Sequence, residues 1–437
     1  MSNLQVQIKN LEIYTKLGAI NILQMFEELN IYDSLFTPCM SGNILITDSI
    51  GLSSKLFFDG SEVLVVEMSK IEGYNQFRKA FRIYKQSGKA ARNETSEKYV
   101  LHFISEEYLL SQQMRVRKAF TASYSDIALR VMHDYLGITN SMISYVEPSV
   151  GIKDFLASNK TPFEILDICS KKAINEKLSP TFLFFENVYG YNFASTSTLI
   201  SQSKSFDLNY DPKNIEITNQ QSNGLMGIRS MEVISNHDVN KNIQSGLYGG
   251  TFIGVDLRNR IIKKKIVTFN EINQNNEHAG KAPDVGQSVN KFGLKNTDMI
   301  DSRVVVYPIS LYDTLSSYVN TNYPSVVNTE DDTYNFIFQR EASIRNITQK
   351  RLKLVMPGNF SLTSGINVGV KLPLRSMRSL QDSKDDSLSG KYIIIAARHI
   401  IRIDRHETIM EVSTDSTDKK EFYNSGYSSL GALQEYE

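Results

Sequence analysis

The feature that most constrains the fold of this chain is the presence of short segments in which apolar and polar residues alternate. These segments form two groups, and a stretch with a different pattern lies between the groups. The first group lies between Leu29 and Ser105, and the second lies between Ile228 and Thr414. A period of two is typical of strands that bury one face. Tyr and Phe, which favour strands, number 22 each, whereas Trp is absent. The sequence therefore predicts a mainly β chain that contains two β units.

The first group predicts antiparallel strands at short spacing. Strands are expected at 42–49, 63–69, 77–86 and 98–105, with a polar hairpin loop at 87–96. Such a run is typical of a small barrel or sandwich.

Between the two groups the pattern changes to that of helices. Apolar residues recur at helical spacing in 106–117 and 125–135, and Gly137 is expected to close the second of these helices in a left-handed conformation. Residues 161–164 read Thr-Pro-Phe-Glu, which is a helix start with a capping box. A strand hairpin is expected within 181–195. This part of the chain is therefore predicted to be an inserted α+β domain.

The boundaries follow from these changes of pattern and from a polar stretch that has almost no apolar content. The predicted division is a first β domain at 1–118, an inserted α+β domain at 119–212, a second β domain at 213–256 and 302–414 that includes a helix at 333–350, a polar arm at 257–301, and a C-terminal tail at 415–437.

Length, charge and cysteine content limit the classes of function. A chain of 437 residues is expected to form two to four domains. Its 48 basic and 48 acidic residues cancel, which argues against strong nucleic-acid binding but is compatible with a channel through which nucleic acid slips. We find no apolar run of membrane-spanning length and no secretory leader, so we expect a soluble protein made in the cytoplasm. Cys39 and Cys169 are expected to be reduced and buried.

A search for catalytic, cofactor-binding and metal-ligating patterns predicts none, so we expect no enzyme, no cofactor and no bound metal. His399 and His406 lie seven residues apart, which is no standard metal spacing, and are expected to be an exposed pair at a turn. The other candidates have structural interpretations: helix-end charge for Glu106, Glu107 and residues 330–332, a solvated strand edge for 263–265, and a turn or bulge for 246–250.

Two stretches carry a resemblance to a known family. Residues 30–48, with the strand entries at 60–64 and 99–105, resemble the opening β unit of central baseplate hub subunits in T-even-like contractile-tailed phages. Residues 354–368, with 389–401, are similar to the barrel segment shared by such hubs and by VgrG-type spike proteins.

The resemblance implies a fold and a role. It implies two tail-tube-like antiparallel β-barrel domains per chain, with α+β segments inserted, and a homotrimer whose six barrels form a pseudo-sixfold ring. Such a ring joins the sixfold tail tube, or a tube-initiator protein, to a threefold central spike and leaves an axial channel for DNA ejection. The resemblance also implies contact with baseplate wedge proteins and a location in the virion tail after assembly in the host cytoplasm. It implies no membrane partner and no lasting nucleic-acid partner.

Three alternatives stay open at the level of sequence. They are the hub of a non-phage contractile injection machine, a tail-associated cell-wall hydrolase, and a glycan-binding adhesin. A hydrolase requires a carboxylate pair, a metal site or a nucleophile with a base, and an adhesin usually presents exposed aromatic platforms.

Overall fold

The computed structural model describes most of the chain, and the statements below concern these residues. They are 6–16, 18–55, 58–70, 77–93, 96–210, 227–236, 238–257, 260–273, 277–280, 303–308, 329–373, 385 and 387–416.

The N-terminal β unit is built from seven strands and one short helix. In chain order these are β1 (Val6–Thr15), β2 (Gly18–Asn21), β3 (Phe26–Ser34), β4 (Ser41–Asp48), α1 (Leu52–Lys55), β5 (Val63–Lys70), β6 (Phe77–Asn93) and β7 (Ser96–Ile104). Their hydrogen-bonded order is β3-β4-β7-β6-β5-β1-β2. Alternate residues such as Ile44, Ile46, Leu64, Phe81 and Phe103 are buried in one core between them. The predicted alternation therefore identifies the core-facing side of these strands.

Two local predictions in this half of the chain are wrong, and one strand was not predicted. The polar stretch predicted as a loop at 87–96 is mostly strand, because β6 continues to Asn93 and pairs with β7 through three β-bulges. The helix predicted at 106–117 ends at Gln113, and β8 (Val116–Ala122) follows. Strand β1, which pairs with β5, lies before the first segment that the sequence pattern identified. Polar residues form strands here because tertiary pairing overrides local propensity.

The C-terminal β unit is a single series of paired strands. Its strands are β13 (Phe206–Tyr210), β14 (Gly227–Ile228), β15 (Ser230–Ser235), β19 (Lys350–Pro357), β20 (Asn367–Lys371), β21 (Gly390–Arg402) and β22 (His406–Thr414). From β13 the pairing passes through β20, β21, β22 and β19 to β15, and β14, which directly precedes β15, pairs with β13. β13 pairs in parallel with β14 and β20, so this unit is not purely antiparallel as expected. Its apolar core includes Leu352, Leu354, Tyr392, Met410 and Val412.

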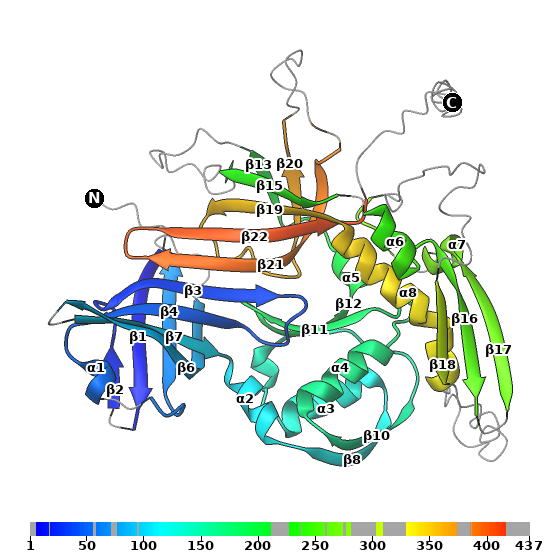
Figure 1. Cartoon of the computed structure of the whole chain (residues 1–437), viewed down its shortest axis with the longest axis horizontal. Coiled ribbons are helices and arrows are strands. Elements are labelled where there is room, and N and C mark those ends of the chain that lie inside the picture. The colour runs from blue at the N-terminus through cyan, green and yellow to red at the C-terminus, as the bar shows by residue number, and fades with distance from the viewer. Residues whose placement is uncertain are drawn as a thin grey trace, which may run out of the picture.

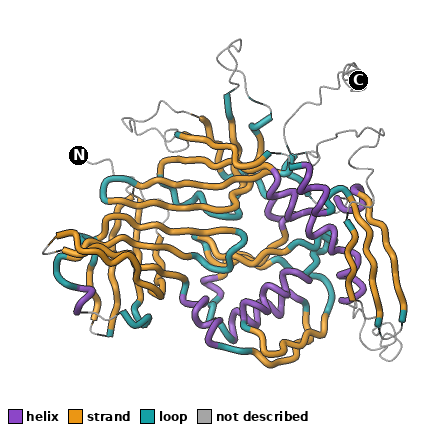
Figure 2. Tube along the Cα trace, in the orientation of Figure 1, coloured by secondary structure: helices purple, strands orange, loops and turns teal. Residues whose placement is uncertain are grey.

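One sheet joins the two β units. β3 of the N-terminal unit pairs with β21 of the C-terminal unit over seven residue pairs, from Glu28↔Arg402 to Ser34↔Ala396. The eight strands β15-β19-β22-β21-β3-β4-β7-β6 therefore form a continuous run, which we call the shared sheet. Figures 1 and 2 show these strands crossing from the upper part of the molecule to its left end.

An α+β unit lies below the shared sheet in Figure 1. Its elements are α2 (Glu106–Gln113), β8, α3 (Tyr124–Asp134), the 3₁₀ helix η1 (Asn140–Met142), β9 (Ile143–Val146), β10 (Lys153–Lys160), α4 (Pro162–Lys172), β11 (Phe182–Asn187), β12 (Gly190–Ser195) and α5 (Thr196–Ser201). The predicted capping box is present, because Thr161 and Glu164 exchange side-chain and backbone hydrogen bonds. The predicted hairpin is the antiparallel pair β11 and β12.

A fourth part differs from the predicted division of the chain. Its elements are α6 (Val239–Ser245), β16 (Gly249–Asp256), β17 (Ile261–Thr268), α7 (Phe269–Asn273), β18 (Val304–Pro308) and α8 (Thr329–Gln349). β16 was expected in the second β domain, but it pairs with β17 and β18 in a separate sheet. Part of the predicted polar arm is therefore strand and helix. Alternation alone cannot show which strands pair, so the sequence could not separate β16 from its neighbours.

Candidate functional site: the outer face of the shared sheet

The shared sheet has one face turned away from both apolar cores, and we call it the outer face. Leu29 and Ile31 of β3 are fully buried in the core, as are Leu352 and Leu354 of β19. The residues that alternate with such core-facing residues lie on the outer face. Among them are Glu28, Asn30, Tyr32, Asn43, Lys98, Arg351, Lys353, Arg398, Arg402, Glu407 and Glu411.

Carboxylates on the outer face are paired with cations from other strands. Arg351 Nη1 of β19 lies 2.8 Å from Glu411 Oε1 of β22, and Lys353 Nζ lies 3.2 Å from Glu232 Oε2 of β15. Further pairs are Arg229 with Glu407 at 3.7 Å, Arg402 with Glu28 at 2.6 Å, and Lys98 with Glu27 at 2.6 Å. Opposite charges that face each other across strands stabilise the pairing modestly. The larger consequence is that these cations have carboxylate neighbours and leave little uncompensated positive charge.

A polar network crosses the seam between β21 and β3. Arg402 Nε donates to Glu28 Oε2 at 2.8 Å, and Arg398 Nε donates to Asn30 Oδ1 at 3.0 Å. Asn30 Nδ2 donates in turn to Asn43 Oδ1 at 3.0 Å. Burial tends to raise the pKa of Glu28, but hydrogen bonds from Asn30 and Arg402 outweigh it and hold that pKa below its usual value. Glu28 is therefore a carboxylate at neutral pH.

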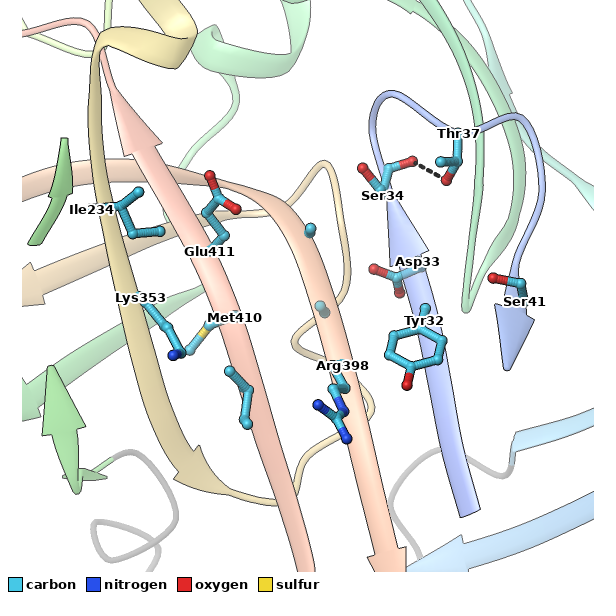
Figure 3. A pocket seen from close by; sticks show the side chains of 13 residues that line it. Tyr32, Asp33, Ser34, Thr37, Ser41, Ile234, Lys353, Arg398, Met410 and Glu411 are labelled. Atoms are coloured by element: carbon cyan, nitrogen blue, oxygen red, sulfur yellow. Dashed lines mark hydrogen bonds between the residues drawn. The ribbon is translucent and has the colours of Figure 1, made fainter. Parts of the chain in front are cut away.

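The outer face is hollowed where the two β units meet (Figure 3). The hollow has a volume of about 290 Å³, and the small side chains of Ala396 and Ala397 on β21 leave room for it. Tyr32 and Arg398 line one side, where the guanidinium lies 5.6 Å from the ring centroid in a cation–π contact. Lys353 and Glu411 also line it. The hollow is open, and charged side chains surround an apolar floor.

Beneath the seam, residues 358–366 contact all three neighbouring units, and we call them the wedge segment. Phe360 stacks on Phe77 of the N-terminal unit with ring centroids 5.1 Å apart. Thr363 Oγ1 and Ser364 N donate to the buried carboxylate of Asp33 on β3, the latter at 3.1 Å. Asn187 Nδ2 of the α+β unit donates to Ser364 O at 2.9 Å. The wedge segment thus holds the seam in place through contacts on the side of the sheet opposite the outer face.

The two histidines expected at an exposed turn are buried against the wedge segment, so that prediction is wrong. His399 is 0% exposed and His406 is 5% exposed, and their ring centroids lie 4.6 and 4.8 Å from that of Phe360. A Cβ atom at Gly358 would lie 2.0 Å from His406 Cγ, so only glycine fits beside this ring. Burial lowers the pKa of His399 to about 3 and also lowers that of His406. Both rings are therefore neutral core side chains at neutral pH.

A buried polar cluster lies where β6 meets the α+β unit. Lys79 pairs with Glu186, whose Oε2 accepts hydrogen bonds from Met40 N at 2.8 Å and Ser105 Oγ at 2.6 Å. Burial lowers the pKa of Lys79 to about 8. The residue types of this cluster resemble those of catalytic sites, but the Lys79 and Glu186 side chains are only 18% and 2% exposed. The cluster therefore joins two units rather than opening to a substrate.

Several of the remaining candidates from the sequence lie at the positions that their structural interpretations require. Cys39 and Cys169 are free and buried, and burial raises the pKa of each thiol to about 12. Glu106 begins α2, and residues 263–265 lie on β17 at the edge of its sheet. Gly246 ends α6 with a φ of 77°. Residues 330–332 lie in α8, but their side chains are outside the described residues.

The described part of the chain contains neither a metal-site cluster nor a helix of membrane-spanning character. No cluster of three or more His, Cys, Asp or Glu side chains there has the arrangement of a metal site. None of the helices described has the length and apolar character needed to cross a bilayer.

Sequence reasoning missed the outer face as a unit, because its residues come from strands far apart in the chain. Arg398 and Glu28 come together only through the β3–β21 pairing, which joins segments more than 360 residues apart. No local signal in a single sequence reports such a pairing.

Comparison with known proteins gives matches in structure only. No family model matches the sequence, and no curated protein matches it. The 43 kDa tail protein of prophage MuSo2 from Shewanella oneidensis is 10% identical, has a TM-score of 0.50, and covers 93% of this chain and 99% of its own. The tail protein from Neisseria meningitidis MC58 is 10% identical, with a TM-score of 0.49, over 93% of this chain and 96% of its own. The c3393 protein of E. coli, described as a type VI secretion component, is 10% identical, with a TM-score of 0.44 over 94% and 77%.

The comparison with the prophage protein establishes a shared fold. At 10% identity it covers nearly the whole of both chains, so all of the units described above belong to the similarity. The chain is thus mainly β and has the fold of a prophage tail protein.

Proposed function

We propose that this chain is a structural subunit of a contractile phage tail baseplate, a hub that forms a homotrimeric ring around an axial channel for DNA. In this proposal each β unit is a tail-tube-like barrel, and three chains supply six barrels in a pseudo-sixfold ring. The ring joins the sixfold tail tube, or a tube-initiator protein, to a threefold central spike, and wedge proteins contact its periphery. The protein acts without catalysis.

The observation that carries the proposal is the charge-paired outer face of the shared sheet. A channel for DNA must be wet and must not retain the polyanion, whose binding depends on free Lys and Arg side chains that displace counterions. On the outer face, cations such as Arg351, Arg402 and Lys353 already pair with glutamates. The fold shared with a prophage tail protein supports the same role.

The first test is the mass of the purified protein in solution, measured by light scattering. The proposal predicts three times the chain mass of 49.6 kDa, with rings visible in negative-stain electron micrographs. A stable monomer that degrades cell-wall preparations would overturn the proposal in favour of a tail-associated hydrolase. A trimer without cell-wall degradation is the expected result.

A further inference from the structure

Lys79 of β6 and Glu186 of β11 lie in contact inside the buried polar cluster, and the proposed function makes no use of their chemistry. Their side chains form an ion pair and are only 18% and 2% exposed. Lys79 Nζ also lies 5.4 Å from the ring centroid of Phe81 and 5.8 Å from that of Tyr191, and both rings are buried. An amine and a carboxyl group are therefore held against each other where aromatic side chains limit the access of water.

Hydrogen bonds fix the orientation of the Glu186 carboxylate. Met40 N and Ser105 Oγ donate to its Oε2 at 2.8 and 2.6 Å, and both donors belong to buried residues. The other oxygen, Oε1, is the one that contacts Lys79 Nζ. Two donors on one oxygen stabilise the negative charge that this oxygen carries when a nucleophile adds to the carboxyl carbon. The carboxyl group is thus oriented as an acyl acceptor with the amine beside it.

Burial favours the uncharged form of this pair. It lowers the pKa of Lys79 to about 8, although the nearby carboxylate of Glu107 opposes the change. Transfer of a proton from the ammonium to Glu186 Oε1 converts the ion pair into a neutral amine and a carboxylic acid, which are the forms that react to give an amide. A site with little water reduces the free-energy cost of that transfer, because buried charges are poorly solvated. Contact between the two groups also raises their effective concentration far above that of free reactants in solution.

We propose that Lys79 and Glu186 condense to an isopeptide bond that links the N-terminal β unit to the α+β unit. The neutral amine attacks Glu186 Cδ, and Oε2 takes the negative charge between its two hydrogen-bond donors. Oε1 already holds one proton from the ammonium, takes a second from Nζ, and leaves as water. The Cδ–Oε1 bond breaks and the Cδ–Nζ bond forms, so the products are one amide and one water. No oxidant or other reactant is needed.

The bond forms within one chain, so this inference goes beyond the proposed function and does not depend on the oligomeric state. β6 belongs to the shared sheet, and β11 pairs with β12 in the separate sheet of the α+β unit. A covalent link between β6 and β11 keeps these two units together even when the noncovalent contacts between them open. It also restricts the unfolded chain, as a disulfide does.

Mass spectrometry of the full-length chain tests the inference. Purified wild type is incubated until its mass is constant and is then denatured, and it should be lighter by one water than the mass calculated from its sequence. A tryptic digest should contain a branched peptide that joins residues 79–82 to residues 178–204, because trypsin does not cleave after an acylated lysine. The variant Lys79→Arg keeps a cation beside Glu186 but has no amine that condenses, so it should have the mass calculated from its sequence.

Two further variants separate this reaction from mere proximity of charges. Ser105→Ala removes one donor to Oε2 and should slow the appearance of the branched peptide by about 10-fold or more, whereas equal rates would overturn the role given to Oε2. Lys171→Arg is the matched control, since Lys171 pairs with Asp167 at 2.6 Å in an exposed ion pair, and it should still lose one water. Wild type with its full calculated mass and two separate peptides overturns the inference. A loss of water that persists in Lys79→Arg also overturns it, because the modified group then lies elsewhere.

Discussion

Asp33 and His399 show how single buried groups behind the outer face respond to pH in opposite directions. Burial raises the pKa of Asp33 to about 6 despite its hydrogen bonds from the wedge segment. The same cause lowers the pKa of His399 to about 3. Burial disfavours the charged form of either group, so an acid becomes weaker and a base becomes less basic.

The variant Asp33→Asn should change the pH dependence of stability. The folded pKa of Asp33 exceeds its unfolded value, so the folded state gains protons preferentially as the pH falls from 7 to 4. In wild type this one group raises the free energy of unfolding by about 2 kcal/mol over that range. Asparagine imitates the neutral acid and does not titrate. The free energies of unfolding of both proteins are measured in urea at pH 7 and at pH 4. Lowering the pH should stabilise wild type relative to the variant by that amount. An unchanged difference between the two free energies would contradict the raised pKa of Asp33.

His399→Gln should shift the same measurement in the opposite direction. The folded pKa of His399 lies below its unfolded value, so the unfolded state binds the proton first and stability falls as the pH drops below about 6.5. This group should cost wild type about 3 kcal/mol at pH 4, whereas glutamine has no proton to gain. The variant should therefore lose less stability than wild type between pH 7 and pH 4. Equal losses of stability in wild type and variant would mean that His399 is solvated or paired in the folded protein, which contradicts the buried position of its ring.

At the scale of elements, contacts between units determine how rigidly the outer face is held. The pair Lys79–Glu186 joins β6 to β11, and the wedge segment joins both β units to the α+β unit. Removing one member of a buried ion pair leaves the other charge without compensation, which costs more than removing both.

A double-mutant cycle on the buried pair tests this view. Lys79→Met should lower the free energy of unfolding by about 3–5 kcal/mol, because Glu186 remains buried and charged. Lys79→Met/Glu186→Gln should cost less, since an amide oxygen still accepts hydrogen bonds from Met40 N and Ser105 Oγ. Denaturant unfolding of the two single variants and the double variant gives the coupling energy. Additive costs would show that the pair is solvated.

The ion pairs of the outer face predict how the affinity of the protein for duplex DNA should change when they are removed. In Glu28→Gln/Glu411→Gln the partners Arg402, Arg398 and Arg351 lose their carboxylates. Affinity for duplex DNA should rise, with a steeper dependence on salt, because these cations can then displace counterions. Fluorescence anisotropy at several salt concentrations measures both quantities.

A matched control for the DNA experiment changes charge equally but away from the shared sheet. Asp134→Asn/Asp167→Asn frees Lys118 and Lys171, which lie on the α+β unit. This variant should bind DNA more weakly than the outer-face variant when both are compared at the same salt. Equal binding would indicate an effect of net charge alone and would remove the special role of the outer face.

At the scale of the whole molecule, the sequence predicted which residues form the strands better than it predicted how the strands assemble. The strands predicted at 42–49 and 63–69 are present as β4 and β5, and the Thr161–Glu164 motif predicted its capping box. The β3–β21 seam, the separate sheet of β16 and the burial of His399 depend on contacts between distant segments. Periodicity reports which face of a strand is apolar, but it does not report what covers that face.

The central claim is that the outer face of the shared sheet lines the channel of a trimeric ring. A cryo-electron microscopy map of the purified oligomer tests it most directly. The account predicts a threefold ring in which Tyr32, Arg398 and Glu411 face the bore (Figure 3). A map in which these side chains are buried between chains, or face the outside of the ring, would contradict it.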